Sequence, residues 1–520
     1  MLLEKNYSKL NQKIKYSVIE EKSLLFIPII CLAALIIRFH YVPFGLPLTF
    51  DAFNGYFLYA LDISILGHFP NYSPSQSGWG EFLSLFFTSF HSDNFIDYMD
   101  LQRTISVILS VITIIPIYFI CKKFFNSYYS LIGALIFAFD PRIIINSTLG
   151  ISEPLYILAI TLGILLFLNT NKKIIYSSFG FFAWATIIRP EGQFWFVAFS
   201  IVYFLRFRKN RRDCILFLVA LAIFLLVLSP FVYQRIQCCG DDAIIGRIIV
   251  EISNYSNPAE LHSQDETNTY GPNWISGIRL FGWSIVPIFI VFVPIGLIPI
   301  FKQLRYPNYL LILAPTVLAI PIMYSVSIAP DTRYVYPLFP IFCVISVFGI
   351  KWIIQNFQNK KIILGIIVIV IILGSVVFLD IKKIDFTEDI EAYQITKLII
   401  NDVKGVNKGP KLIKYIPIVE MENKWPIKET TGEYIKEYSI KTVSTTGYNS
   451  LNELIALQKS NLTHLIVDQD KNNPEYILDI LNNGKKYPFL IKEFDSSEHG
   501  FDFMTKVYKI DYNIFKETQN

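Results

Sequence analysis

The sequence predicts a multi-pass α-helical membrane protein that ends in a small water-soluble α/β domain. Of its 520 residues, 53% are hydrophobic and only 17% are charged, and the mean hydropathy is +0.44. Soluble domains have about a quarter of their residues charged, so lipid is expected to surround most of this chain. A net charge of +4 gives no sign of a nucleic-acid partner, and the six cysteines show no metal-ligand spacing.

About eleven apolar segments are long enough to cross a bilayer. A crossing takes roughly 20 apolar residues, and somewhat fewer where flanking side chains snorkel. The first segment follows a Lys-rich start and is not followed by a small-residue cleavage site, which is typical of a retained signal anchor. The predicted spans are residues 23–39, 104–121, 127–140, 153–169, 174–188, 192–206, 213–233, 280–300, 308–328, 334–351 and 361–380.

The charges of the loops predict the orientation of these spans. With a cytoplasmic N-terminus, the outer loops contain no Lys before residue 380, whereas each inner loop is short and basic. This sorting is what the positive-inside rule requires. The inner set comprises Lys122–Lys123, Lys172–Lys173, Arg206–Arg212, Lys302 with Arg305, and Lys351 with Lys360 and Lys361. We therefore expect a cell-membrane protein whose N-terminus is cytoplasmic and whose C-terminal domain is extracytoplasmic.

The composition changes after residue 380, which divides the chain into a transmembrane domain (1–380) and a soluble domain (381–520). In the second part Lys, Asn, Asp and Glu become frequent, and the apolar runs shorten to strand length. Alternating strands and helices predict a small α/β domain. The expected strands are Leu412–Val419, His464–Asp468 and Lys506–Asp511, and the expected helices are Leu451–Lys459 and Glu475–Leu481.

The first outer loop, residues 40–103, is long and semi-apolar and carries a candidate acidic residue. On a helix, Asp51, Asn54, Gly55 and Asp62 recur at spacings of three, four and seven, which places them on one face. Such a helix would lie along the membrane surface with its polar stripe towards water or a cavity. The alternative interpretation is that Asp51 caps this helix, because Asp favours N-caps.

Three further outer turns bring charged side chains to the same level as Asp51. Glu153 begins one span, Arg189 and Glu191 lie between two short spans, and Arg333 begins another. Taken singly, Glu153 could complement a helix dipole, and Arg189 could pair with Glu191 at the interface. Together they predict a polar cavity lined by Asp51, Glu153, Arg189 and Arg333. A carboxylate that accepts a proton, opposite cations that neutralise a departing phosphate, suits transfer of a group from an anionic lipid.

Several of these motifs resemble the polytopic glycosyltransferases of the GT-C fold, particularly the protein O-mannosyltransferase and aminoarabinose-transferase branch. The resemblance covers approximately residues 20–350. It implies inverting transfer from a polyprenyl-phosphate-linked sugar to a protein or lipid acceptor on the non-cytoplasmic face. The motifs are residues 47–62 with Gly78-Trp-Gly80, Asn146–Glu153, Arg189-Pro-Glu-Gly192, and Arg333-Tyr334 ahead of Pro337.

The same resemblance implies roles for individual residues. Asp51 corresponds to the catalytic acidic residue of the first outer loop and would act as general base. Arg189, Arg333 and Tyr334 would hold the donor phosphate. Asn54, Glu153 and Glu191 would support the site. Asp51 with Glu153 could also bind a divalent cation through oxygen ligands, although two carboxylates alone make a poor metal site.

Two departures from the family pattern bear on the substrate. Ala52 stands where members with a paired Asp-Glu have Glu, which bears on how the acceptor is recognised. Residues 381–520 contain no Trp-Trp-Asp motif of the oligosaccharyltransferase type. Transfer of a single hexosyl or pentosyl unit is therefore favoured over transfer of a whole oligosaccharide. The alternatives are an oligosaccharyltransferase-like enzyme, or a non-enzymatic flippase or transporter of lipid-linked sugars. A transporter should carry polar residues in mid-span, where most of the predicted spans are nearly free of charge.

Overall fold

The described part of the chain covers most of both predicted domains. The Lys-rich start of the sequence and residues 243–273 of the predicted outer segment 234–279 lie outside it. The computed structural model describes residues 24–74, 76–242, 274–328, 331–383, 385–401, 403, 405–408, 411–427, 441–444, 448, 450–457, 462–470 and 473–519.

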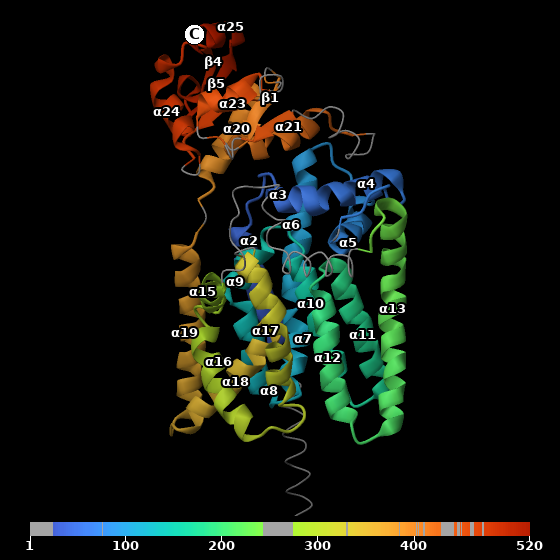
Figure 1. The fold of residues 1–520 in the computed structure, drawn as a ribbon. Helices are drawn as coiled ribbons and strands as arrows, with labels where there is room; N and C mark the ends of the chain where they lie inside the picture. Colours follow the sequence, from blue (N-terminus) through green and yellow to red (C-terminus); the bar gives the residue numbers. More distant parts are fainter. Residues whose placement is uncertain are drawn as a thin grey trace, which may run out of the picture.

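A bundle of long helices forms the larger part of the molecule, and a helix lies on each of the eleven predicted spans (Figure 1). Its helices are α2 (Phe26–Tyr41), α6 (Phe95–Ile112), α7 (Ile114–Lys122), α8 (Ser127–Ala138), α10 (Glu153–Phe167), α11 (Lys172–Ile188), α12 (Gly192–Phe207), α13 (Arg211–Cys239), α16 (Phe289–Lys302), α17 (Leu310–Ile328), α18 (Phe339–Gln355) and α19 (Lys360–Ile381). Among the described residues, five helical stretches are long and apolar enough to cross a membrane, or up to seven if two bent pairs each count as one. The protein is a multi-pass membrane protein.

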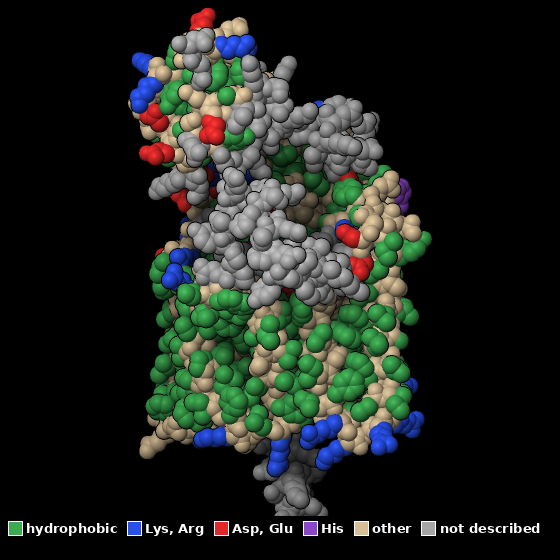
Figure 2. Space-filling view, viewed as in Figure 1, with side chains coloured by type: hydrophobic (Ala, Val, Ile, Leu, Met, Phe, Trp, Pro, Cys, Tyr) green, Lys and Arg blue, Asp and Glu red, His purple; other side chains and the backbone are tan. Residues whose placement is uncertain are grey.

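The outside of the bundle carries a broad apolar belt (Figure 2). On α13, Leu218 and Leu226 are 62% and 72% exposed, and Ile362 and Ile369 on α19 are exposed to a similar degree. Such a surface would be costly in water, whereas lipid chains solvate it. Below the belt, Lys and Arg side chains gather at one end of the bundle.

One of the predicted spans is bent rather than straight. The predicted span 280–300 is wrong as a single helix, because α15 (Trp274–Ser284) meets α16 at 90°. Pro287 lies in this break and has no N–H for a helical hydrogen bond. A second bend lies at the end of the predicted span 127–140, where α8 is followed at 52° by α9 (Pro141–Ser147). Asp140 caps α9 by accepting hydrogen bonds from the backbone N–H groups of Arg142 and Ile143, at 3.0 and 3.1 Å.

The first outer loop folds into short helices: α3 (Phe50–Ala52), the π-helical turn η1 (Phe53–Phe57), α4 (Leu58–Leu66) and α5 (Ser77–Phe87). Asp51 and Asn54 are exposed, but Asp62 is fully buried and accepts a 2.5 Å hydrogen bond from Tyr72. The expectation that Asp62 shares the polar face is therefore wrong. A π turn holds an extra residue, which rotates the following helix by about 100°. The N-cap position is Thr49, so Asp51 is not the cap of this helix.

The C-terminal part builds a five-stranded sheet in the order β2-β1-β3-β5-β4. Strands β2, β1 and β3 pair in parallel, and β5 runs antiparallel to both of its neighbours, β3 and β4. The predicted strand Leu412–Val419 is wrong: it forms η4 (Lys411–Lys414) and α21 (Ile416–Asn423), where Pro417 suits the first helical turn. The other predicted strands and both helices are present. The elements are α20 (Thr387–Ile399), β1 (Gly405–Lys408), β2 (Lys441–Ser444), α23 (Leu451–Leu457), β3 (His464–Asp468), α24 (Glu475–Asn483), η5 (Gly484–Lys486), β4 (Leu490–Asp495), η6 (Ser496–His499), β5 (Thr505–Ile510) and α25 (Tyr512–Gln519).

The C-terminal domain contacts one end of the bundle through Trp425. The Trp425 ring lies 5.2 Å from the Phe95 ring and 5.0 Å from the Tyr98 ring, centroid to centroid, at the start of α6. Its Nε1 donates a 3.1 Å hydrogen bond to the carbonyl of Ser92. This contact joins the sheet domain to the loop that carries Asp51.

Candidate functional site

A polar cavity of about 460 Å³ opens at the end of the bundle that faces the C-terminal domain. Its walls come from the first outer loop, from the turn between α11 and α12, and from η3 (Thr332–Leu338), which leads into α18. It is lined by Phe50, Asp51, Asn54, Gly55, Tyr56, Pro74, Gln76, Arg189, Asp331, Arg333 and Tyr334. Five of the predicted site residues are in this set: Asp51, Asn54, Arg189, Arg333 and Tyr334.

Arg333 lies close to three carboxylates. Asp51 and Asp331 line this cavity, whereas Glu153, which the sequence predicted as a lining residue, is not among the residues that line it. Asp331 caps η3 by accepting from the Arg333 backbone N–H at 2.8 Å, and it also accepts from Arg333 Nε at 2.5 Å. The two remaining nitrogens of the guanidinium point elsewhere: Nη2 lies 3.3 Å from Asp51 Oδ2, and Nη1 lies 3.9 Å from Glu153 Oε1. The cap thus fixes the start of the side chain, and the planar guanidinium reaches both carboxylates.

Glu153 is the buried counter-charge of both arginines. Its side chain is 2% exposed at the first position of α10, and Oε1 accepts a short hydrogen bond from Arg189 Nη1. Within the described residues, Oε2 is buried with no hydrogen-bond partner. Arg189 also lies 3.4 Å from Glu191 and stands over the Tyr334 ring at 5.4 Å. A buried carboxylate between two cations holds both guanidinium groups at a fixed separation.

The turn that presents Arg189 needs glycine after it. Arg189 ends α11, and its backbone N–H donates to the Ala185 carbonyl at 2.9 Å. At Gly192 the chain doubles back so closely that a Cβ would collide with the backbone of Ala185 and Thr186. The Arg-Pro-Glu-Gly motif therefore specifies a tight turn as well as the charged groups.

Two neutral polar side chains, Tyr56 and Gln76, also line the cavity. Tyr56 Oη donates a 2.7 Å hydrogen bond to Gln76 Oε1 and accepts one from Ser152 at 3.1 Å. Burial raises the pKa of Tyr56 to about 12, so its hydroxyl keeps its proton at neutral pH. Tyr56 and Gln76 were not among the predicted site residues. Gln76 lies just before the Gly78-Trp-Gly80 motif, but nothing in the sequence marks its side chain as part of the site.

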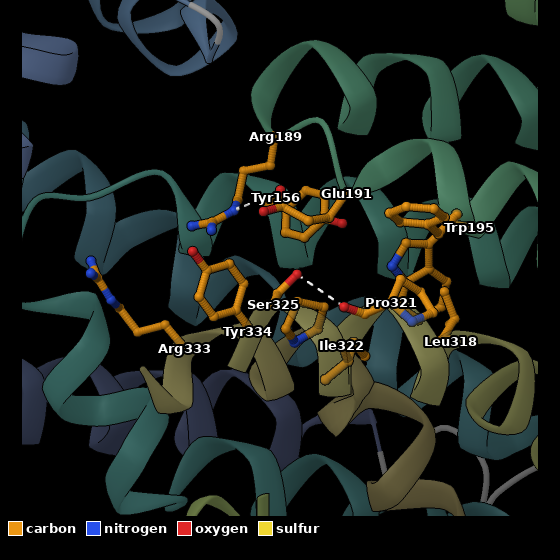
Figure 3. A pocket seen from close by; sticks show the side chains of 12 residues that line it. Tyr156, Arg189, Glu191, Trp195, Leu318, Pro321, Ile322, Ser325, Arg333 and Tyr334 are labelled. Atoms are coloured by element: carbon orange, nitrogen blue, oxygen red, sulfur yellow. Dashed lines mark hydrogen bonds and ion pairs between the residues drawn. The ribbon is translucent and has the colours of Figure 1, made fainter. Parts of the chain in front are cut away.

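A second, mostly apolar pocket adjoins the polar cavity and shares Arg189, Arg333 and Tyr334 with it. Figure 3 shows Arg189 and Tyr334 at one end of this pocket, with Leu318, Pro321 and Ile322 of α17 and Trp195 of α12 at the other. Glu191 lines this pocket and not the polar cavity. Charged groups at one end and apolar groups at the other match a ligand with a charged head and a hydrocarbon tail.

The turn at Asp140–Arg142, between α8 and α9, serves the fold rather than the site. Arg142 donates a 2.8 Å hydrogen bond to the Trp283 carbonyl, and its guanidinium stands over the Trp283 ring at 4.7 Å. It thereby ties α9 to α15.

As for a metal, the part of the chain that the structure describes contains no group of three or more His, Cys, Asp or Glu side chains that could hold an ion.

The comparisons with known proteins agree with this architecture. A family model described as dolichyl-phosphate-mannose-protein mannosyltransferase matches residues 86–233, which include Glu153 and Arg189. No curated protein matches the sequence. The oligosaccharyltransferase of Archaeoglobus fulgidus has a similar structure, with 12% identity and a TM-score of 0.55 over 89% of this chain and 68% of that one. Another structure of it, AglB with an inhibitory peptide and a dolichol-phosphate, matches with 12% identity and a TM-score of 0.55 over 86% and 69%.

ArnT from Cupriavidus metallidurans bound to undecaprenyl phosphate is similar along nearly its whole length. It is 11% identical, with a TM-score of 0.52 over 94% of this chain and 98% of that one. This chain has the GT-C fold. The GT-C fold places the first outer loop, the turn after α11 and η3 at one end of the bundle, where Asp51, Arg189 and Arg333 meet. The family match ends before Arg333 and begins after Asp51, so the pairing of these two residues is visible only in the structure.

Proposed function

We propose that this protein is a GT-C glycosyltransferase that transfers one sugar from a polyprenyl-phosphate-linked donor to a protein or lipid acceptor. The observation that carries the proposal is the position of Arg333, between the exposed Asp51 and the buried Glu153. It places a carboxylate that can accept a proton beside a cation that can stabilise a phosphate. These are the two groups that glycosyl transfer from a lipid phosphate needs.

The two adjoining pockets offer separate places for the phosphate, the hydrocarbon tail and the sugar of the donor. The phosphate would lie between Arg189, Arg333 and Tyr334, the residues common to both pockets. The hydrocarbon tail would enter the apolar pocket along Leu318 and Ile322, and the sugar would occupy the polar cavity beside Asn54 and Gln76. The structures of ArnT with undecaprenyl phosphate and of AglB with a dolichol-phosphate support a polyprenyl phosphate as the lipid part of the donor.

The chemistry is a single displacement at the anomeric carbon. The acceptor oxygen forms a bond to this carbon while the bond from the carbon to the phosphate oxygen breaks, which inverts the configuration. Asp51 takes the acceptor proton, and the polyprenyl phosphate departs with the bonding electron pair. Arg189 and Arg333 stabilise the charge on the departing phosphate without moving, because Glu153 and Asp331 hold them in place.

The charge distribution supports an extracytoplasmic site. Lys and Arg gather at the end of the bundle away from the cavity (Figure 2). By the positive-inside rule that end faces the cytoplasm, so the cavity and the C-terminal domain face outward. Activated lipid-linked sugars suit such a site, because their bond energy travels with the lipid and no nucleotide sugar is needed there.

The test is a transfer assay with the purified full chain in proteoliposomes. A radiolabelled polyprenyl-phosphate hexose or pentose is supplied with membrane proteins and lipids from cells that lack this chain. We expect label in an acceptor fraction and release of polyprenyl phosphate in equal amount. Label that crosses the bilayer without entering any acceptor would instead identify a flippase. Transfer that requires a lipid-linked oligosaccharide would identify an oligosaccharyltransferase-like enzyme.

A further inference from the structure

A third pocket, of about 280 Å³, lies at the opposite end of the bundle from the polar cavity. It is formed where the turn between α12 and α13 meets the turn between α16 and α17. Its lining residues are Leu205, Arg206, Phe207, Arg208, Lys209, Asn210, Tyr306 and Tyr309. None of these is acidic, so the pocket carries three cationic side chains and no compensating carboxylate of its own.

The arrangement of Arg206 leaves its positive charge uncompensated. Its Nη1 and Nη2 donate to the carbonyls of Phe167 and Asn169, at 2.7 and 2.8 Å, and its guanidinium lies 4.2 Å above the Tyr306 ring. The nearby Asp213 is already engaged by Lys172, whose Nζ lies 2.7 Å from its Oδ1. Carbonyls and a ring orient a guanidinium without neutralising it, so the pocket attracts an anion.

Two tyrosine hydroxyls in the same pocket lack partners. The Tyr306 and Tyr309 rings are 5.8 Å apart, and within the described residues both hydroxyl oxygens are buried without a hydrogen bond. Burial raises the pKa of Tyr306 to about 12, so the hydroxyl is a proton donor at neutral pH. A buried polar group without a partner is unfavourable, and a bound acceptor would relieve it.

We propose that this pocket binds the phosphate headgroup of an anionic phospholipid in the adjacent leaflet. The phosphate would pair with Arg208 and Lys209, which are exposed at the rim. On binding, the two tyrosine side chains would shift so that their buried hydroxyls donate to it. A lipid is favoured over free phosphate because the pocket adjoins exposed apolar side chains. Phe204 and Leu205 on α12 are 41% and 43% exposed and give acyl chains a surface to lie on.

The place of this pocket in the fold suggests what the lipid does. Helices α12 and α17 line the apolar pocket at the outer end of the bundle and flank the basic pocket at the inner end. A phosphate that joins the α12–α13 turn to the α16–α17 turn would hold the two helices together at their inner ends. The bound lipid would stabilise the bundle without taking part in the transfer reaction. This proposal is therefore independent of the proposed function.

The experiment is native mass spectrometry of the detergent-purified full chain with added phosphatidylglycerol or phosphatidylcholine. We expect one tightly retained phosphatidylglycerol, weaker retention of phosphatidylcholine, and no displacement by millimolar inorganic phosphate. Removing two charges with Arg208→Gln and Lys209→Gln should weaken retention roughly thirtyfold. The control, Lys360→Gln with Lys361→Gln, removes the same charge at the start of α19 and should have no effect.

A second variant separates the pocket from general surface charge. Tyr306→Phe with Tyr309→Phe keeps every charge and both rings, and it should also weaken retention, while thermal unfolding without lipid confirms that the variant is folded. If the Arg208/Lys209 variant and the Lys360/Lys361 control lost lipid retention equally, the attraction would be non-specific and the proposal would be overturned. So would full retention in the tyrosine variant, or displacement of the lipid by free phosphate.

Discussion

Arg333 Nη2 lies 3.3 Å from Asp51 Oδ2, although 282 positions separate the two residues in the chain. Asp51 stands on a short helix of the first outer loop, and Arg333 stands on the 3₁₀ turn that leads into α18. The candidate site therefore forms only when the two halves of the bundle pack together. Taken alone, Asp51 is an exposed side chain and Arg333 a partly exposed one. Together they suggest a site for proton transfer beside a phosphate.

Asp51→Asn should abolish most of the transfer activity while leaving the protein folded. The amide cannot accept the acceptor's proton, and loss of a placed general base costs roughly 10²–10⁴-fold in rate. The measurement is kcat for transfer from the radiolabelled donor. Asp93→Asn, at an exposed site on the same outer loop, is the matched control and should leave kcat unchanged. Unchanged transfer by the Asp51 variant would remove Asp51 from the mechanism.

Arg333→Ala should weaken donor binding more than Arg333→Lys does. A hydrogen bond to a charged group contributes about 1.5–3 kcal/mol, which corresponds to a rise in donor KM of roughly tenfold to a hundredfold. Lys keeps the charge but cannot reach Asp331, Asp51 and Glu153 at once, so the rescue should be partial. Equal KM values for the wild type and the Ala variant would contradict a role in phosphate binding.

Leu318→Trp should fill the apolar pocket and discriminate between donors by tail length. Leu318 is 1% exposed on α17 and faces the pocket, whereas Ile320 on the same helix is 75% exposed. We expect the Leu318 variant to lose activity with a long polyprenyl donor and to retain more with a short-chain analogue. Ile320→Trp is the control and should treat both donors as the wild type does. A loss that does not depend on tail length would point to misfolding.

Glu153→Gln should destabilise the protein much more than Glu191→Gln, although both carboxylates contact Arg189. Removing the acid of a buried pair leaves two cations facing each other, at a cost of about 3 kcal/mol. The Glu191 side chain is 29% exposed and lies 3.4 Å from Arg189, so its loss should cost below about 1 kcal/mol. Unfolding free energies in mixed micelles would compare the two. Similar values would show that Glu153 is not the central counter-charge.

Trp425→Ala should loosen the C-terminal domain from the bundle. The ring contacts Phe95 and Tyr98 but is only partly buried, so we expect a loss of about 2 kcal/mol, less than for a fully buried Trp. The readout is the rate of proteolysis between the end of α19 and the start of α20, which should rise. Trp425→Phe keeps an aromatic ring against Phe95 and Tyr98, so its proteolysis rate should lie between those of the wild type and the Ala variant. An unchanged rate in the Ala variant would show that other contacts hold the domain.

The sequence by itself determined the helical segments, the strands around residues 464–468 and 505–510, and the turns that carry charge. These features are local: hydropathy over one span or alternation over one strand is set by neighbouring residues. The same locality explains the errors. Pro417 fits a helix start as well as a break in a strand, and the π turn at 53–57 turns Asp62 inward by inserting one residue.

Only the tertiary structure decided which turns meet and what lies between them. Glu153 could be interpreted as a helix-dipole partner and Arg189 as the partner of Glu191, because sequence spacing gives no distance between separate helices. Packing brings Glu153 under both arginines and makes Gln76 a wall of the cavity. It also forms an apolar pocket between α12 and α17 that no sequence motif predicted. Contacts across a bundle depend on how helices pack, and that is a property of the whole chain.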